Sequence, residues 1–487
     1  MASGTLAGLD MERVTIPQLQ FAMNRGRLSA AELTGFYLDR INRIDPLVNA
    51  VLALNGNALA QAAASDRVRR TSGPRSLLEG IPILLKDNID TADQGATAGS
   101  EALVAARPDD AELVQRLRAA GAVIIGKANL SEWANFRSTL SSSGWSAVGG
   151  QTNNPYVLDR NPCGSSSGSG AGVAASLAVV AIGTETDGSI VCPAGANGIV
   201  GHKPTLGLVS GDGVVPISSQ QDTAGPMARN VTDAAIVLDV VDGADTDYTD
   251  ALDPDALQGA RIGVWSTATG GSTPAVDALF AETVQRLEAL GATTVEVVPP
   301  YQDEFNSNEF PALLYEFAHD VDAYLAQTGG AHPADLEGLI EFNKARADTE
   351  LQYFGQDIFI AAERTGGNLT DQKYITARKT ATTAAQRSID ETLAEFDLDA
   401  IVAPTNSPAW RTTLGEGDAF KFGSSGPAAV AGYPNVSVPM GYVGPLPVGM
   451  SVFAGAGDDP TVLGLAFAWE QATHVRRPPT YEPTLNR

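Results

Sequence analysis

The chain has 487 residues, of which 44% are hydrophobic and 18% are charged, and its formal net charge is −25. This composition is typical of a globular protein with a large core and excludes a disordered or repeat chain. Because a surface with this negative charge repels phosphate groups, we expect neither nucleic acid nor an anionic membrane as a partner.

The sequence carries no recognisable targeting or metal-binding segment. The N-terminus lacks a basic stretch followed by an apolar one, and no run of about 18 apolar residues predicts a membrane-spanning helix. Two cysteines, Cys163 and Cys192, are too few for a disulfide framework or a Cys-rich zinc site. We expect a cytoplasmic protein without metal or cofactor, either a monomer or a homo-oligomer.

Helical and strand patterns alternate along the chain. Helices are expected between residues 10 and 75, with Ser29 as the N-cap of the second helix. Helix-then-strand patterns follow at 111–129 and 171–189, strands at 261–265, 292–300, 398–405, 434–441 and 447–455, and helices at 274–290 and 380–396. This order predicts an α/β fold whose mixed central sheet is covered by helices on both faces.

The chain reads as a single domain, because no Pro/Gly/Ser-rich linker divides it. Residues 303–375 are mainly helical in pattern and rich in aromatic side chains. They predict an insert that covers one end of the sheet. C-terminal strands and a helix are expected over 397–475.

The stretch CGSSSGSGAG, residues 163–172, admits several interpretations. A linker is disfavoured because a helical pattern follows at once. Ser166 lies in a G-x-S-x-G pattern, as in the nucleophile elbow of α/β-hydrolase esterases, and His474 is the one late candidate base. No strand pattern precedes the loop, which counts against that elbow and also against a dinucleotide-binding glycine motif.

Lys86 ends an apolar run, IPILLK, and is expected at the buried end of a strand. Burial disfavours the ammonium, so a neutral lysine could act as a general base. The alternative is a structural ion pair with Asp87 or Asp90. In the loop GTETDGS, the turn at Asp187 and Gly188 could direct backbone N–H groups toward an oxyanion, with Ser189 as the attacking hydroxyl.

These segments together resemble the amidase signature family. The resemblance rests on GIPILLKDNID, NPCGSSSGSGAGVAA, GTETDGSIVCPAGANGIVGHKPT and the C-terminal GYPNVSVPMG, and it places the signature core at 76–245. It implies a Ser-cisSer-Lys triad in which Ser189 is the nucleophile, Ser165 the bridging serine in a non-proline cis peptide, and Lys86 the base.

The resemblance also implies further roles. The backbone N–H groups of residues 186–189 (Thr186, Asp187, Gly188 and Ser189) would form the oxyanion hole, and Ser166 would support the relay. The resemblance fades in the segment 133–147 and in the aromatic insert, and there we expect the substrate-binding residues, including Trp133, Ala134 and Phe136. Asp187 is a further candidate, as an acceptor for a substrate N–H or a partner for a protonated amine.

The nucleophile loop departs from the common family pattern, since Glu185, Asp187 and Val191 stand where Asp, Gly and Arg are usual. This version is most similar to the peptide amidase branch and also occurs in aryl acylamidases, so the expected substrate is a small-molecule or peptide amide. Three alternatives stay open: a carbamate or urethane hydrolase, a partner-dependent glutaminase subunit of an amidotransferase, and an inactive binding protein.

Overall fold

The computed structural model describes residues 4–244 and 246–485. Its centre is an 11-stranded sheet in the order β12-β11-β13-β15-β14-β9-β10-β8-β4-β5-β3, and two small hairpins lie outside it. The strand bounds of the sheet are β3 Val51–Leu54, β4 Pro82–Lys86, β5 Val123–Ala128, β8 Val180–Glu185, β9 Val200–Lys203, β10 Thr223–Ala228, β11 Arg261–Val264, β12 Thr293–Glu296, β13 Ala400–Pro404, β14 Asn435–Val443 and β15 Leu446–Phe453. The hairpins are β1 Thr5–Leu6 with β2 Leu9–Asp10, and β6 Trp145–Ser146 with β7 Gly150–Gln151.

The sheet is mixed. Strand β4 runs parallel to both β5 and β8, and β11 runs parallel to β12 and β13, whereas the strands between these two groups pair antiparallel. Strands β4, β5 and β8 are buried along their whole length, as expected of parallel strands covered on both faces. The predicted α/β class with a mixed central sheet is confirmed.

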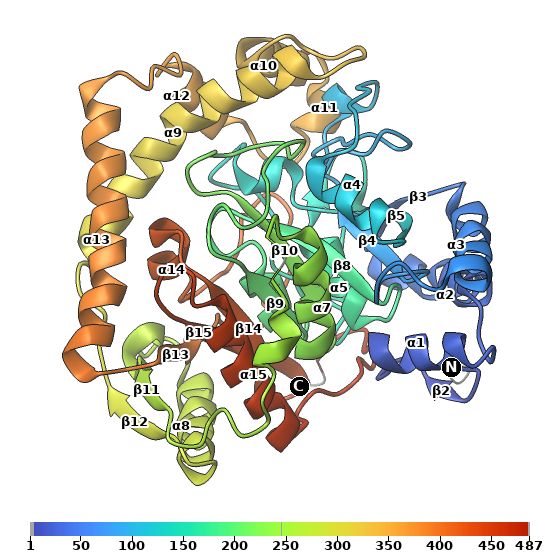
Figure 1. The fold of residues 1–487 in the computed structure, drawn as a ribbon. Coiled ribbons are helices and arrows are strands. Elements are labelled where there is room, and N and C mark those ends of the chain that lie inside the picture. The colour runs from blue at the N-terminus through green and yellow to red at the C-terminus, as the bar shows by residue number, and fades with distance from the viewer. Residues whose placement is uncertain (1–3, 245, 486–487) are drawn as a thin grey trace.

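Helices flank this sheet (Figure 1). Those packed close to it include α5 and α7 against β8 and β10, and α8 and α15 against β14. The helix bounds are α1 Ile16–Asn24, α2 Ala30–Val48, α3 Ala58–Ser72, α4 Glu112–Ala119, α5 Ser167–Ala174, α6 Val191–Ala196, α7 Val231–Val241, α8 Pro274–Ala289, α9 Gln302–Gln327, α10 Leu336–Ala345, α11 Ala347–Glu350, α12 Asp357–Glu363, α13 Gln372–Phe396, α14 Gly426–Ala431 and α15 Asp459–Thr473.

The segment 303–375 is helical and builds one side of the molecule. Helices α9, α10 and α12 lie together in the upper part of Figure 1, and α13 runs down the left-hand side beside α9. Phe317 of α9 and Phe359 of α12 share a hydrophobic cluster with Trp133. The helical layer is therefore joined to the rest of the chain by its own core.

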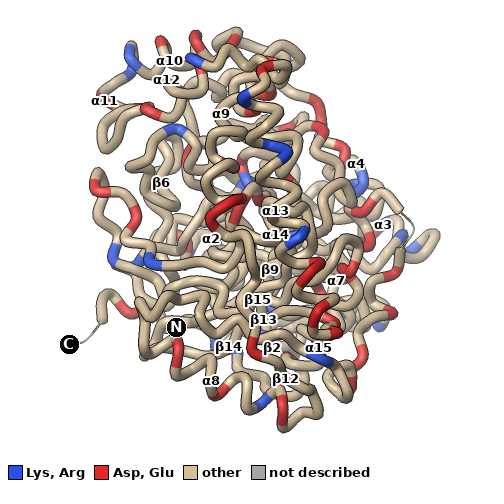
Figure 2. Tube along the Cα trace, turned by 90° about the vertical axis from the view of Figure 1, so that its left-hand side faces the viewer, with Lys and Arg blue, Asp and Glu red and all other residues tan. Residues whose placement is uncertain are grey.

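Local signals also match the structure. Ser29 caps α2, where its side chain and that of Glu32 form a capping box. His474 is the left-handed C-cap of α15, with φ 46°. Acidic and basic residues are interspersed along the trace (Figure 2). Within the described residues, no helix has the length and apolar character needed to cross a bilayer.

Candidate active site

Lys86 is the last residue of β4 and is fully buried. Its Nζ lies 2.7 Å from the Ser165 hydroxyl, 2.7 Å from the Thr184 hydroxyl and 3.2 Å from the Thr184 carbonyl oxygen. Strands β4 and β8 are parallel neighbours, so their carboxyl ends meet at one edge of the sheet. This topology brings Lys86 and Thr184 together although 98 residues separate them.

The environment of Lys86 favours its neutral form. Burial lowers its pKa to about 7, and the charges of Asp222 and Glu185 only partly oppose this effect. The alternative ion pairs with Asp87 and Asp90 are wrong. Asp87 instead pairs with Lys127 at 3.3 Å, and Asp90 accepts a hydrogen bond from Tyr324.

The serine-rich loop is held down by its own hydroxyl groups. Ser166 donates to the Thr184 carbonyl, Ser167 to the Cys163 carbonyl and Ser169 to the Ile182 carbonyl, so each serine has a separate role. The peptide bond between Gly164 and Ser165 is cis, as the resemblance implied. Ser165 alone among these four serines contacts Lys86.

Glycine lets helix α5 approach the sheet closely. A Cβ atom at Gly168 would lie 2.3 Å from the Ala50 carbonyl oxygen and 2.5 Å from the Asn129 carbonyl oxygen. Any larger residue would push the helix outward. Because the serine loop leads directly into α5, this close approach sets the position of Ser165.

The loop after β8 turns back on itself around Glu185. The Glu185 carboxylate accepts hydrogen bonds from the backbone N–H groups of Ile190 (2.7 Å) and Val191 (3.0 Å). Gly188 has φ +79°, a conformation that glycine adopts at no steric cost. The backbone N–H groups of Asp187, Gly188 and Ser189 donate to no acceptor within the described part of the chain.

Two further residues fix this loop from outside. Thr186 donates its hydroxyl to Asp222 at 2.5 Å, and Asp222 in turn accepts from the N–H groups of Ile217 and Ser218. The Gln221 amide donates to the Thr186 carbonyl and to Glu309 of α9, and it accepts from Arg378 of α13. The nucleophile loop is thus tied to the helical layer.

The structure brings the serine loop and the nucleophile loop together. The backbone N–H of Ser166 donates to the Ser189 carbonyl at 3.1 Å. Ser189 retains 8% exposure, whereas Ser165, Ser166 and Lys86 are fully buried. The backbone of Ser189 therefore lies beside the loop that carries Ser165, and Ser189 is the most exposed of Lys86, Ser165 and Ser189.

Cys163 and Cys192 form a disulfide, with 6.0 Å between their Cα atoms. The bond joins the residue before Gly164 to α6, which begins two residues after Ser189. The number of cysteines excluded only a framework of several disulfides, and nothing in the sequence pattern indicated that Cys163 and Cys192 would form a bond. The disulfide braces the serine loop against the nucleophile loop.

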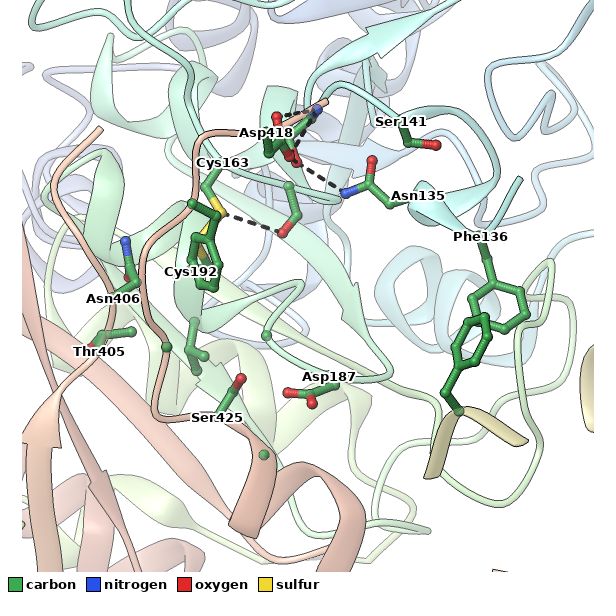
Figure 3. A pocket seen from close by; sticks show the side chains of 18 of the residues that line it. Asn135, Phe136, Ser141, Cys163, Asp187, Cys192, Thr405, Asn406, Asp418 and Ser425 are labelled. Atoms are coloured by element: carbon green, nitrogen blue, oxygen red, sulfur yellow. Dashed lines mark hydrogen bonds between the residues drawn. A yellow bond between two sulfur atoms is a disulfide. The ribbon is translucent and has the colours of Figure 1, made fainter. Parts of the chain in front are cut away.

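A cavity of about 600 Å³ opens beside this site (Figure 3). Phe136, Phe310 and Ile358 contribute apolar surface, whereas Asn135, Ser141, Ser143, Asp418, Asn406, Asp187 and Ser425 contribute polar groups. Among the described residues that line it there is no lysine or arginine.

The predicted substrate-binding residues divide into two groups. Phe136 and Asp187 line the cavity. Trp133 is buried in the hydrophobic cluster with Phe359, and Ala134 packs against that cluster. Ser166 is bonded to strand β8. Sequence reasoning missed Thr184, Asp222 and Asp418. Thr184 lies inside a motif that carries the family resemblance, but no local signal pointed to Asp418.

The nucleophile-elbow alternative is wrong. Between β7 and Ser166 the described chain forms no strand that could lead into an elbow, and the Ser166 hydroxyl donates to the Thr184 carbonyl. His474 lies at the end of α15 and lines a different cavity, together with Arg13, Arg229 and Arg476. No histidine lines the cavity beside Ser189 within the described residues.

Comparisons with known proteins match nearly the whole chain. A family model described as Amidase matches residues 32–463. A probable amidase of Arabidopsis thaliana is 39% identical over 494 residues, which cover 97% of this chain and 92% of that protein. A glutamyl-tRNA(Gln) amidotransferase subunit of Symbiobacterium thermophilum is 37% identical over 481 residues, covering 93% of this chain and 96% of that protein.

Solved structures are similar over nearly the whole chain. The native peptide amidase from Stenotrophomonas maltophilia superposes with a TM-score of 0.92 at 47% identity, covering 96% of this chain and 99% of that one. A peptide amidase in complex with the competitive inhibitor chymostatin gives a TM-score of 0.94 at 48% identity, with the same coverage.

Proposed function

Since this chain belongs to the amidase signature family of amide-hydrolysing enzymes, we propose that it cleaves carboxamide C–N bonds through an acyl-enzyme on Ser189. Ser165 bridges Ser189 and Lys86, and Lys86 is the base. The observation that carries this proposal is the 2.7 Å contact between Lys86 Nζ and the Ser165 hydroxyl at a fully buried site.

The first half of the reaction forms the acyl-enzyme. Neutral Lys86 takes the hydroxyl proton of Ser165, which takes that of Ser189 as the Ser189 oxygen bonds to the substrate carbonyl carbon. The carbonyl oxygen becomes an oxyanion. The N–H groups of Asp187, Gly188 and Ser189 hold it, and removing one such donor typically costs about 10²–10³ in rate.

The second half releases both products. The proton on Lys86 returns through Ser165 to the leaving nitrogen, and the C–N bond breaks. Water then attacks the ester carbonyl of the acyl-enzyme and gives a proton to the same relay. A carboxylic acid leaves and the Ser189 hydroxyl is restored.

The proposed substrate is a peptide amide or a related amide with an aromatic or apolar acyl group. The similarity to two peptide amidase structures supports this choice. So does the cavity, in which Phe136, Phe310 and Ile358 offer apolar contacts and polar groups surround the rest. Carbamates and urethanes present a similar carbonyl and are the second substrate class to assay.

A glutaminase subunit is the competing function, supported by the 37% identity to an amidotransferase subunit. Glutamine carries a free α-carboxylate, and the described residues that line the cavity offer no cation to bind one. We therefore propose that the enzyme works without a partner chain. Its cytoplasmic location stays a prediction, and the disulfide points instead to an oxidising compartment.

Covalent labelling tests the nucleophile. The purified protein is treated with a fluorophosphonate, and the modified serine is identified by peptide mass mapping. Label on Ser189 that is absent in Lys86→Ala is the expected result. Label on Ser166, or no label at all, contradicts the proposal.

Hydrolysis of N-acetyl-phenylalanine amide tests the relay. Ser165→Ala should reduce kcat by several orders of magnitude, whereas Ser169→Ala is the matched control because it removes a buried hydroxyl from the same segment that bonds only to Ile182. Equal losses in the two variants would show that Ser165 is structural. Glutamine hydrolysis by the isolated chain would favour the glutaminase function.

A further inference from the structure

Two carboxyl groups are the charged side chains among the described residues that line the active-site cavity. Asp418 is engaged, because it accepts hydrogen bonds from the backbone N–H and the hydroxyl of Ser143. Asp187 has the Ser425 hydroxyl as its hydrogen-bonding neighbour. Asp187 therefore keeps acceptor capacity for a bound molecule.

Asp187 faces the cavity. Asp187 is exposed and lines the cavity, whereas Thr186 and Ser189 on either side of it are buried. Figure 3 shows its carboxyl group next to Ser425. It stands two residues before Ser189, within about 7 Å along the chain. A carboxyl placed there can reach the nitrogen of an amide bound at Ser189.

The groups around Asp187 determine its charge. Desolvation inside the cavity and the nearby carboxylates of Glu309 on α9 and Glu185 on β8 raise the pKa of Asp187 well above its usual value, and the Ser425 hydroxyl and Lys203 on β9 oppose this effect only in part. The shift favours the protonated carboxyl relative to an aspartic acid in water. In either protonation state the carboxyl keeps an oxygen that accepts a hydrogen bond.

We propose that Asp187 is the specificity-determining residue of this site: it accepts a hydrogen bond from the N–H of the scissile amide and thereby selects amides over esters of the same acid. The inference rests on the proposed function. An ester offers an oxygen lone pair where the amide offers an N–H, so in an ester complex the acceptor of Asp187 would stay unpaired. Sites built to hydrogen-bond a substrate N–H discriminate against analogues that lack it.

The test compares a matched pair, N-acetyl-phenylalanine amide and its methyl ester, in the wild type and in two variants. Asp187→Asn keeps an acceptor oxygen in a side chain of the same shape, and Asp187→Ala removes it. We expect the ratio of kcat/KM for amide over ester to fall about tenfold in Asp187→Ala, as for one lost hydrogen bond, and to stay within about twofold of wild type in Asp187→Asn. Asp239→Asn is the control, because that carboxyl accepts from the backbone N–H of Tyr248, does not line the cavity and should leave the ratio unchanged.

An unchanged ratio in Asp187→Ala overturns the inference, and so does an equal fall in Asp187→Asn. If Asp187→Ala does not fold, the wild type supplies a second measurement with the N-methyl and N,N-dimethyl amides of the same acid. The dimethyl amide has no N–H, so its kcat/KM should be about tenfold lower than that of the N-methyl amide. Equal values of kcat/KM overturn the inference. If neither amide nor ester is hydrolysed by the wild type, it is the proposed function that fails.

Discussion

Burial lowers the pKa of Lys86 from 10.5 to about 7, and this shift sets the acid limit of the reaction. The relay needs neutral lysine. At pH 7 about half of the molecules carry it, against about 0.03% for a lysine in water. Burial therefore supplies roughly a thousandfold more active base at neutral pH. Below pH 7 the neutral fraction, and with it kcat/KM, should fall about tenfold per pH unit.

The assay measures kcat/KM between pH 5 and 9 for N-acetyl-phenylalanine amide, which has no titrating group in that range. Asp222→Asn supplies the perturbation. The Asp222 carboxylate is the first of the charges that hold the pKa of Lys86 up, so its removal should move the acid limb to lower pH. A profile that stays flat down to pH 5, or an acid limb that moves upward in Asp222→Asn, would refute the lysine-base mechanism.

Three further predictions concern stability. Between pH 7 and 10.5 the unfolded chain binds a proton at Lys86 that the folded chain lacks, so the free energy of unfolding rises with pH in that range. Relative to Lys86→Met, the wild type should gain about 2–3 kcal/mol of unfolding free energy between pH 6 and 9, measured by urea unfolding. The same pH dependence of stability in both proteins would contradict this. Reducing the Cys163–Cys192 disulfide, which spans 29 residues, should cost about 3–4 kcal/mol and lower the Tm in calorimetry, whereas an unchanged Tm would show that the bond constrains nothing. Gly168→Ala would place a Cβ atom 2.3 Å from a backbone oxygen, so it should lower the free energy of unfolding by about 1–3 kcal/mol and reduce activity. Gly172→Ala would place its Cβ atom 3.3 Å from a side-chain methyl and should be tolerated. Equal melting temperatures of the two variants would contradict the packing argument.

The sequence alone determined the elements and their order. Apolar runs such as the one before Lys86 predicted buried strands, because a parallel strand covered on both faces needs apolar side chains throughout. The cap at Ser29 was readable for the same local reason, since its hydrogen bonds close within three residues. Because these signals lie within a few residues, they do not depend on the rest of the fold.

The family resemblance indicated which distant residues belong to one site, and the tertiary structure showed which contacts bring them together. From its sequence position alone, Lys86 could equally form an ion pair with Asp87. In the folded chain β4 lies beside β8, and Lys86 therefore contacts Ser165 and Thr184 instead. Local pattern also could not tell an aromatic residue of the core from one of the cavity. Trp133 and Phe136 are three residues apart, yet only Phe136 lines the cavity, because helices α9 and α12 pack over Trp133.

The disulfide and Asp187 are two further features whose partners only the tertiary structure reveals. Neither the spacing of Cys163 and Cys192 nor their neighbours indicates that they meet, since the contact depends on how the serine loop and α6 pack. Asp187 was visible as an unusual residue in the nucleophile loop. The rise of its pKa depends on desolvation in the folded protein and then on Glu309, which lies 122 positions further along the chain on α9. Local propensity acts over a few residues, whereas burial and charge act through space, so only the folded chain sets the chemistry of this site.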